Sequence, residues 1–314
     1  MNSIGQVMIK AILAILLLIC FLPGASQVIS FNMYDDVIIT LDKPENYSSK
    51  RKTQVIFFAL PNGNTTAQTM GKKLAPGDDW HFDIQHIRAQ THYIRNELPK
   101  ENIVVVYLEN TYKSWPSWKS KNSDHIEKVR HILDTITPLF KSKKTTIALN
   151  GHSGGGRFVF SCLDGFESLP SNITNITFLD SDYGYESRYA PLLLKWLKQN
   201  KNARLNVFAY NDSVALYEGK RVVSDTGGTW TRSHMMMHDL ASLNFVKLQD
   251  DSLIVYKSSM DQVHFYFKTN PDKNIFHTHQ VELNGFIHSI LLGTKKEEKG
   301  YKYFGARVYS SYIH

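Results

Sequence analysis

Short apolar segments alternate with segments of helical spacing along most of this chain, and this alternation constrains the fold more than any other feature. Apolar runs of strand length, typical of strands covered on both faces, lie at residues 53–60, 103–108, 146–149, 176–179, 205–210 and 253–256. Apolar residues at helical spacing lie at 87–98, 125–140, 157–163, 192–197, 235–245 and 281–292. Such alternation requires crossover connections, so we expect an α/β fold with a mostly parallel central sheet and helices on both faces.

The first residues differ from the rest of the chain. Lys10 precedes an uncharged run at 11–22 that ends at Pro23-Gly24. This run is about a dozen residues, whereas a bilayer span takes roughly 20. We therefore expect residues 1–26 to be a removed signal peptide, with an uncleaved helical anchor as the alternative. A lipidated Cys20 is disfavoured because Ile19 stands where a small residue is usual.

Removal of that segment would leave one domain, residues 27–314, which is long enough to bury a sizeable core. We expect this domain to be secreted or periplasmic, with no stable membrane insertion. Cys162 would be its one remaining cysteine, so no intramolecular disulfide is expected. Its position predicts a small core residue on the helix that follows residue 156.

The net charge of +7 raises the question of an anionic polymer as partner. The basic residues are scattered, however, and the run at 295–299 is interleaved with two glutamates. A solvated surface explains them better, and we expect no nucleic-acid partner.

A GxSxG motif, Gly151-His152-Ser153-Gly154-Gly155, lies between an apolar strand and a helix. In this context the serine occupies a strained turn with its hydroxyl projecting from the sheet, and side chains at Gly151 or Gly155 would collide with backbone. The sequence therefore predicts Ser153 as a nucleophile. The alternative is a glycine-rich helix entry with a capping serine.

A nucleophile of this kind needs hydrogen-bond donors for the developing oxyanion. We expect one donor to be the amide of Gly154 and the other to be the amide of Gly63 or Asn64, unless Asn-Gly here is an ordinary turn. His152 is included among the candidate substrate-binding residues.

No metal or cofactor is expected. His234 and His238 lie four residues apart but lack the glutamate of a zinc-binding HExxH motif.

The acid should follow the nucleophile in the chain and precede the histidine. Asp212 follows the strand at 205–210 and is our first choice. Asp180 and Asp182, which follow the preceding strand, are the alternatives, and either would otherwise cap a helix or brace a loop.

The histidine should lie between the last strand and the final helix. His277 is the first choice because it directly precedes the helical segment at 281–292. His279 is second, and His264 is third because it lies in an alternating, strand-like segment at 263–267.

The strand, the GHSGGG turn, the later aspartate and the late histidine together resemble the α/β-hydrolase superfamily over most of residues 27–314. Further segments resemble an exported bacterial branch of it; they are 59–64, 79–86, 227–230, 277–278 and 284–285. The resemblance implies the fold and a serine hydrolase mechanism, without a substrate. The loop at 61–64 departs from the HGGG form of many esterases, which leaves the second oxyanion donor open.

These features predict a serine hydrolase that cleaves a small or oligomeric ester through an acyl-enzyme. A peptidase or amidase on the same scaffold is the second hypothesis, and a non-catalytic binder of envelope glycan or peptide is the third. Residues 213–245 are a candidate lid insertion, and the aromatic segment around Trp80, His81 and His86 could also cover the site; both could equally be surface loops. The sequence does not indicate the oligomeric state.

Overall fold

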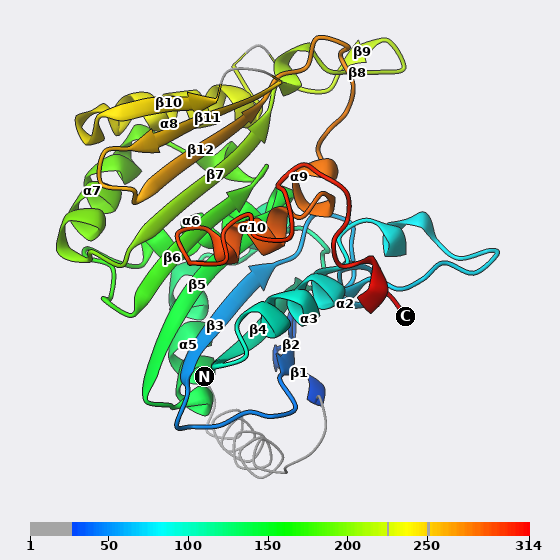
Figure 1. The fold of residues 1–314 in the computed structure, drawn as a ribbon, viewed down its shortest axis with the longest axis vertical. Coiled ribbons are helices and arrows are strands. Elements are labelled where there is room, and N and C mark those ends of the chain that lie inside the picture. Colours follow the sequence, from blue (N-terminus) through cyan, green and yellow to red (C-terminus); the bar gives the residue numbers. More distant parts are fainter. Residues whose placement is uncertain (1–26, 225, 250–251) are drawn as a thin grey trace.

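A ten-stranded sheet runs through the residues that the computed structural model describes, which are 27–224, 226–249 and 252–314 (Figure 1). The predicted signal peptide, 1–26, lies outside these residues. The strand order across the sheet is β1-β2-β4-β3-β5-β6-β7-β12-β11-β10. In chain order the strands are β1 (Gln27–Tyr34), β2 (Val37–Lys43), β3 (Lys52–Ala59), β4 (Glu101–Asn110), β5 (Lys144–His152), β6 (Ile173–Leu179), β7 (Arg204–Tyr210), β10 (Phe245–Gln249), β11 (Leu253–Ser258) and β12 (Val263–Lys268).

The centre of the sheet is parallel, as predicted. The strands β4, β3, β5, β6, β7 and β12 run in one direction, whereas β1 and β2 at one side and β11 and β10 at the other pair antiparallel. Because the central strands are parallel, their carboxyl ends lie along one edge of the sheet, where a site is expected.

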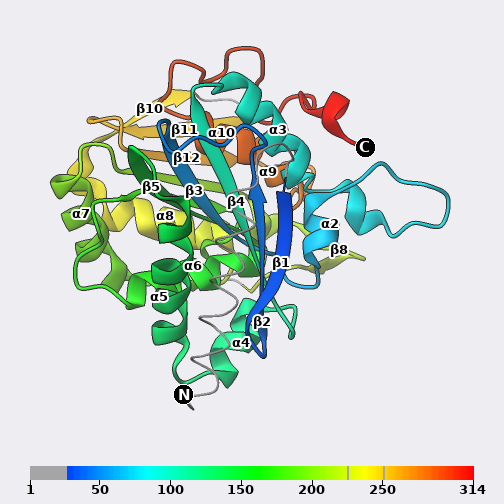
Figure 2. The ribbon, with the colours of Figure 1, turned by 90° about the horizontal axis from the view of Figure 1, so that it is seen from below.

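Helices cover both faces of the sheet. Figure 2 shows α3 and α10 on one side and α5 and α6 on the other. The helices are α2 (Thr66–Met70), α3 (Ile87–Glu97), α4 (Trp115–Lys121), α5 (His125–Ile136), α6 (Gly156–Asp164), α7 (Ala190–Gln199), α8 (Thr229–Asp239), α9 (His279–Glu282) and α10 (Gly285–Leu291).

Each face of the sheet has its own hydrophobic core. Along β3, Val55 and Phe57 belong to the core beneath α4–α8, and Ile56 and Phe58 belong to the core beneath α3 and α10. Successive side chains of a strand point to opposite faces, so a strand covered on both faces needs consecutive apolar residues. This explains why the apolar runs predicted the central strands.

The proposed lid insertion divides into two parts. Residues 216–221 form a small exposed hairpin of β8 (Leu216–Tyr217) and β9 (Lys220–Arg221). In contrast, α8 buries Met236, and Leu240 just after it is also buried, in the core beneath α4–α8. Within the predicted lid segment 213–245, α8 therefore belongs to the layer that covers the sheet, and the exposed part is the hairpin of β8 and β9.

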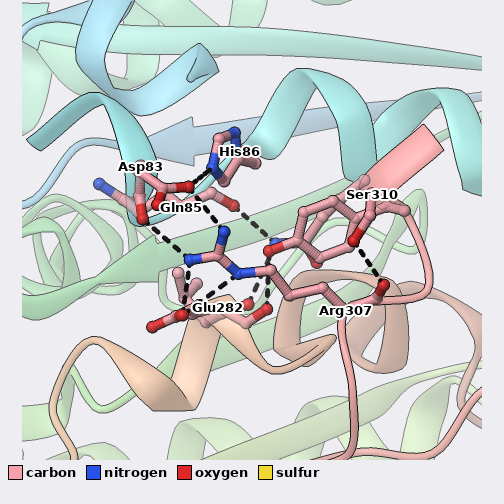
Figure 3. Close-up of polar contacts among 9 residues, drawn as sticks. Asp83, Gln85, His86, Glu282, Arg307 and Ser310 are labelled. Atoms are coloured by element: carbon pink, nitrogen blue, oxygen red, sulfur yellow. Dashed lines mark hydrogen bonds and ion pairs between the residues drawn. The ribbon is translucent and has the colours of Figure 1, made fainter. Parts of the chain in front are cut away.

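The C-terminal segment is tied to the loop that precedes α3 (Figure 3). The Arg307 guanidinium donates to Asp83 Oδ1 at 2.6 Å and to Glu282 Oε1 at 2.6 Å, and His86 Nε2 lies 2.7 Å from the same Asp83 oxygen. His86 is buried in this cluster. Three distant stretches, at 83–86, 282 and 307, are thus held by charge-assisted hydrogen bonds, which are stronger than neutral ones.

Cys162 is a buried free thiol on α6, which confirms the prediction of a core residue there. Among the described residues, no helix combines the length and the apolar character that crossing a bilayer demands.

Candidate active site

The nucleophile turn lies where β5 ends. Ser153 directly follows the last residue of β5, and its φ of 55° is in the left-handed region that non-glycine residues rarely adopt. A turn of this conformation aims the serine side chain away from the sheet, toward the space beyond the strand ends. Ser153 is partly exposed there, so its hydroxyl can be reached from outside.

The glycines of the turn are required by crowding, as the sequence predicted. A Cβ at Gly155 would lie 2.1 Å from the carbonyl oxygen of Ala59, and one at Gly151 would lie 2.8 Å from the carbonyl carbon of Gly155. Both obstacles are backbone atoms, which cannot rotate away. The turn can therefore press against the end of β3 only because these positions have no side chain.

His277 lies in the loop between β12 and α9, and its ring reaches Asp180. Its Nδ1 and Asp180 Oδ2 form a short hydrogen bond between residues 97 positions apart. The His277 side chain is 24% exposed and the Asp180 side chain is 0% exposed. A buried carboxylate on Nδ1 fixes the ring orientation and leaves Nε2 as the nitrogen that can exchange a proton with a neighbour.

His152 packs behind His277. The two ring centroids are 4.7 Å apart, and His152 Nε2 donates to the His277 carbonyl oxygen at 3.2 Å. Burial, and next the nearby His277, hold the pKa of His152 well below its usual range, so this ring is neutral. Its predicted role as a substrate-binding residue is not supported by this position, because the 2% exposed side chain instead supports the loop that carries His277.

The structure places Asp212, the first choice for the acid, at the start of a helix and not beside His277. Asp212 accepts hydrogen bonds from the backbone N–H groups of Thr229, at 2.7 Å, and Trp230, at 3.4 Å, which begin α8. Gly228 brings this helix start close, with a φ of 86°, and a Cβ there would lie 2.5 Å from both carboxylate oxygens. Asp212 caps a helix, and Asp180, the alternative, is the partner of the histidine.

Three buried carboxyl groups gather beneath His277. The Thr229 hydroxyl donates to Asp180 Oδ1 and lies 3.4 Å from Asp212 Oδ2. Burial, with the charge of Asp180, raises the pKa of Asp212 to about 7, and burial raises that of Asp182 well above its usual range. Asp180 accepts hydrogen bonds at both oxygens, one from the Thr229 hydroxyl and one from the His277 ring.

The two other histidines do not reach this pair. His264 is near the amino end of β12, away from the site edge, and its Nε2 lies 3.0 Å from Asp261. Burial lowers its pKa to about 4. His279 begins α9, and its ring packs against Phe276, with centroids 5.7 Å apart.

A pocket of about 230 Å³ opens beside Ser153, and both Ser153 and Gly154 line it. Gly154, a predicted oxyanion donor, thus borders this pocket. The amide of Gly63 instead donates to the Lys113 carbonyl at 2.8 Å. Asn64 is buried and does not line the pocket, whereas Asn62, two residues earlier, does.

Comparison with solved structures decides the fold. A feruloyl esterase module from Clostridium thermocellum, a serine-to-alanine mutant in complex with sinapinate, superposes with a TM-score of 0.50 at 14% identity, over 90% of this chain and 93% of that chain. The structure of a second protein, FAE, superposes with a TM-score of 0.50 at 13% identity, over 90% of this chain and 92% of that chain. The chain has the α/β-hydrolase fold.

Other comparisons add less. A thermostable esterase matches with a TM-score of 0.47 at 13% identity, over 78% of this chain and 55% of that chain. No family model and no curated protein matches the sequence.

Sequence reasoning did not single out Asn62, and it ranked Asp180 behind Asp212 as the partner of the histidine. Asp180 directly follows β6, and Asn62 follows Leu60-Pro61 at the exit of β3, so position at a strand end was an available signal for both. The sequence argument favoured Gly63 in the loop after β3 for its flexible backbone and overlooked the preceding residue, Asn62. Among the residues that the structure describes, no group of three or more His, Cys, Asp or Glu side chains is arranged to hold a metal ion.

Proposed function

We propose that this chain is a serine hydrolase that cleaves carboxylic esters through an acyl-enzyme, with Ser153 as nucleophile, His277 as base and Asp180 as the acid. The observation that carries the proposal is the His277–Asp180 hydrogen bond at the same sheet edge as the left-handed Ser153. A nucleophile, a base and a buried carboxylate that orients the base are the parts that acyl transfer requires.

In the first step His277 Nε2 accepts the proton of Ser153 as its oxygen attacks the ester carbonyl. Asp180 holds the Nδ1 proton of the imidazolium and stabilises its charge. The backbone N–H of Gly154, with the backbone N–H of Asn62, stabilises the oxyanion. His277 then protonates the leaving alcohol, and a water molecule activated by the same ring releases the acyl group.

Esters are preferred to amides as first substrates because the feruloyl esterase module shares the fold. That likeness contributes nothing more specific, since fold alone does not fix function. The pocket beside Ser153 is smaller than most sites for drug-sized ligands, which supports a short group on at least one side of the ester.

The test is the hydrolysis of 4-nitrophenyl acetate by purified residues 27–314. Ser153→Ala should lose activity by at least about a thousandfold, while Ser168→Ala, at an exposed serine beyond α6, should keep it. A fully active Ser153→Ala protein would overturn the proposal.

Histidine variants provide a second, independent comparison. His277→Ala should lose activity by about a thousandfold or more, and His279→Ala should lose much less. The reverse order would remove His277 from the mechanism. Far-ultraviolet circular dichroism of each variant distinguishes a lost base from a lost fold.

We also propose that residues 1–26 direct export. The support is the sequence pattern alone, a basic residue followed by a short apolar run and a break at Pro23-Gly24. Expression of the full chain in a bacterial host, followed by fractionation and N-terminal sequencing, should find exported protein that begins near residue 27. Retention of the intact chain in the cytoplasm would contradict this.

A further inference from the structure

Arg157 is a positively charged side chain in the pocket of the proposed nucleophile. It lies in the first turn of α6, the helix that follows the nucleophile turn, and it lines the same pocket as Ser153 and Gly154. The side chain is partly buried. Its cationic head therefore shares the space that a substrate must enter to reach Ser153.

Within the described residues, Arg157 has no ion pair or hydrogen bond, unlike several other partly buried arginines. Arg95 pairs with Asp42, and Arg307 pairs with Asp83 and Glu282. Partial burial removes part of the hydration of a guanidinium, so an anion beside it is favourable. An anionic ligand would supply the missing partner.

Gly184 leaves room for the guanidinium of Arg157 because it has no side chain. A Cβ at Gly184 would lie 2.7 Å from Arg157 Nη1 and 2.8 Å from its Cζ, so the planar group rests against the bare backbone of the turn after β6. Asp182, in the same turn, accepts from Ser233 at 2.8 Å and is fully buried. It makes no ion pair with Arg157.

Two further groups in the pocket can donate hydrogen bonds. The side-chain amide of Asn62 and the hydroxyl of Tyr183 both belong to pocket-lining residues, and neither forms a side-chain hydrogen bond with another described residue. No acidic residue lines the pocket. The donors come from three separate elements, the loop after β3, α6 and the turn after β6, and the whole set suits an oxygen anion rather than a cation.

We propose that Arg157 binds a carboxylate of the substrate, so that the ester cleaved at Ser153 carries a carboxylate on its acyl or its alcohol part. The proposal rests on the function proposed above. The guanidinium fork matches the two oxygens of a carboxylate, which a single ammonium would not. The pocket volume of about 230 Å³ limits the group that it holds to a short one. The overall charge of +7 would further favour the approach of an anion.

The experiment compares matched pairs of esters of similar size, in which one member is anionic and the other is neutral. On the acyl side, 4-nitrophenyl hemiglutarate is compared with 4-nitrophenyl pentanoate. On the alcohol side, 4-acetoxybenzoate is compared with 4-acetoxybenzamide. In at least one pair the anionic ester should have a kcat/KM about tenfold or more above that of its neutral partner, as expected for a partly desolvated charge pair.

The Arg157→Gln variant should lose this preference, so that the ratio of kcat/KM values, anionic over neutral, falls by about tenfold or more. Arg157→Lys should keep part of it. Arg130→Gln, which removes an exposed arginine on α5 outside the pocket, is the matched control and should leave the ratio unchanged. A neutral preference in both pairs, or an unchanged ratio in Arg157→Gln, would overturn the inference.

A binding measurement separates this inference from the function on which it rests. In Ser153→Ala protein, glutarate should raise the melting temperature, and the added Arg157→Gln substitution should remove that rise. If Ser153 hydrolyses neutral and anionic esters equally well, the role of Arg157 is refuted and the proposed function stands. If no ester is hydrolysed but glutarate still binds through Arg157, the proposed function is refuted and the anion site stands.

Discussion

Asp212 provides a prediction whose magnitude follows from its surroundings. Burial and the charge of Asp180 raise its pKa from 3.8 to about 7, so the native state binds this proton more tightly than the unfolded chain does. Between about pH 4 and pH 7 the native state therefore holds more protons, and the free energy of unfolding falls as the pH rises. Above pH 7 both states are ionised, and the effect levels off.

The size of this effect follows from linkage. A pKa difference of one unit corresponds to about 1.4 kcal/mol. Integration of the two titrations from pH 5 to pH 7 gives a loss of about 2 kcal/mol from this one carboxyl group. In Asp212→Asn the side chain cannot ionise, but it can still accept from the Thr229 amide that begins α8. The variant should therefore lose this part of the pH dependence.

The assay is urea unfolding of both proteins at pH 5 and pH 7. The free energy of unfolding of Asp212→Asn minus that of the native protein should increase by about 2 kcal/mol between these pH values. Asp35→Asn, which changes an exposed aspartate in the turn between β1 and β2, is the control and should give a constant difference. A difference for Asp212→Asn that stays constant or decreases with pH would refute the reasoning.

Three further predictions follow from the site and its supports. Asp180→Asn should lower kcat for ester hydrolysis by about a thousandfold or more, while Asp212→Asn should lower it by less than about tenfold; the opposite ranking in steady-state kinetics would reassign the acid. Gly155→Ala should fail to fold, because its Cβ would meet the Ala59 carbonyl oxygen at 2.1 Å, and native near-ultraviolet circular dichroism would contradict this. Arg307→Ala should lower the free energy of unfolding by about 2 kcal/mol, because two carboxylates lose charge-assisted hydrogen bonds; urea unfolding at unchanged midpoint would count against it.

The central strands could be predicted from the sequence because they are covered on both faces. Consecutive apolar residues such as those of β3 and β4 have no other common explanation at that length. The edge strand β1 was missed because its side chains alternate between exposed and more buried positions, as Val28 and Ile29 do, and include polar residues. An alternating strand at the start of the described chain gives a weaker signal than a continuous apolar run.

Helix ends were harder because distant residues set them. The segment predicted at 235–245 begins instead at Thr229, since the carboxylate of Asp212 caps that helix start from 17 positions away. The final predicted helix is broken at Asn284, whose φ is 66° and whose side chain donates to the carbonyl oxygens of Lys302 and Ala306. Neither contact can be read from local spacing.

The same non-local logic applies to the two candidate acids. Both Asp180 and Asp212 follow central strands, so the sequence offered two equivalent carboxylates. The choice between them depends on which carboxylate caps the start of a helix, and that depends on where α8 packs. The nucleophile turn was different, because its glycines and its place between strand and helix are local features.

The most direct test of the account is the site that a fluorophosphonate probe modifies. Such a probe forms a covalent bond only with a serine activated by a neighbouring base. Intact mass and peptide mapping of labelled 27–314 protein should find one adduct, on Ser153, and the adduct should form far more slowly in His277→Ala. A folded native protein that remains unlabelled, or that is labelled at another serine, would contradict the claim that Ser153 and His277 form a working pair.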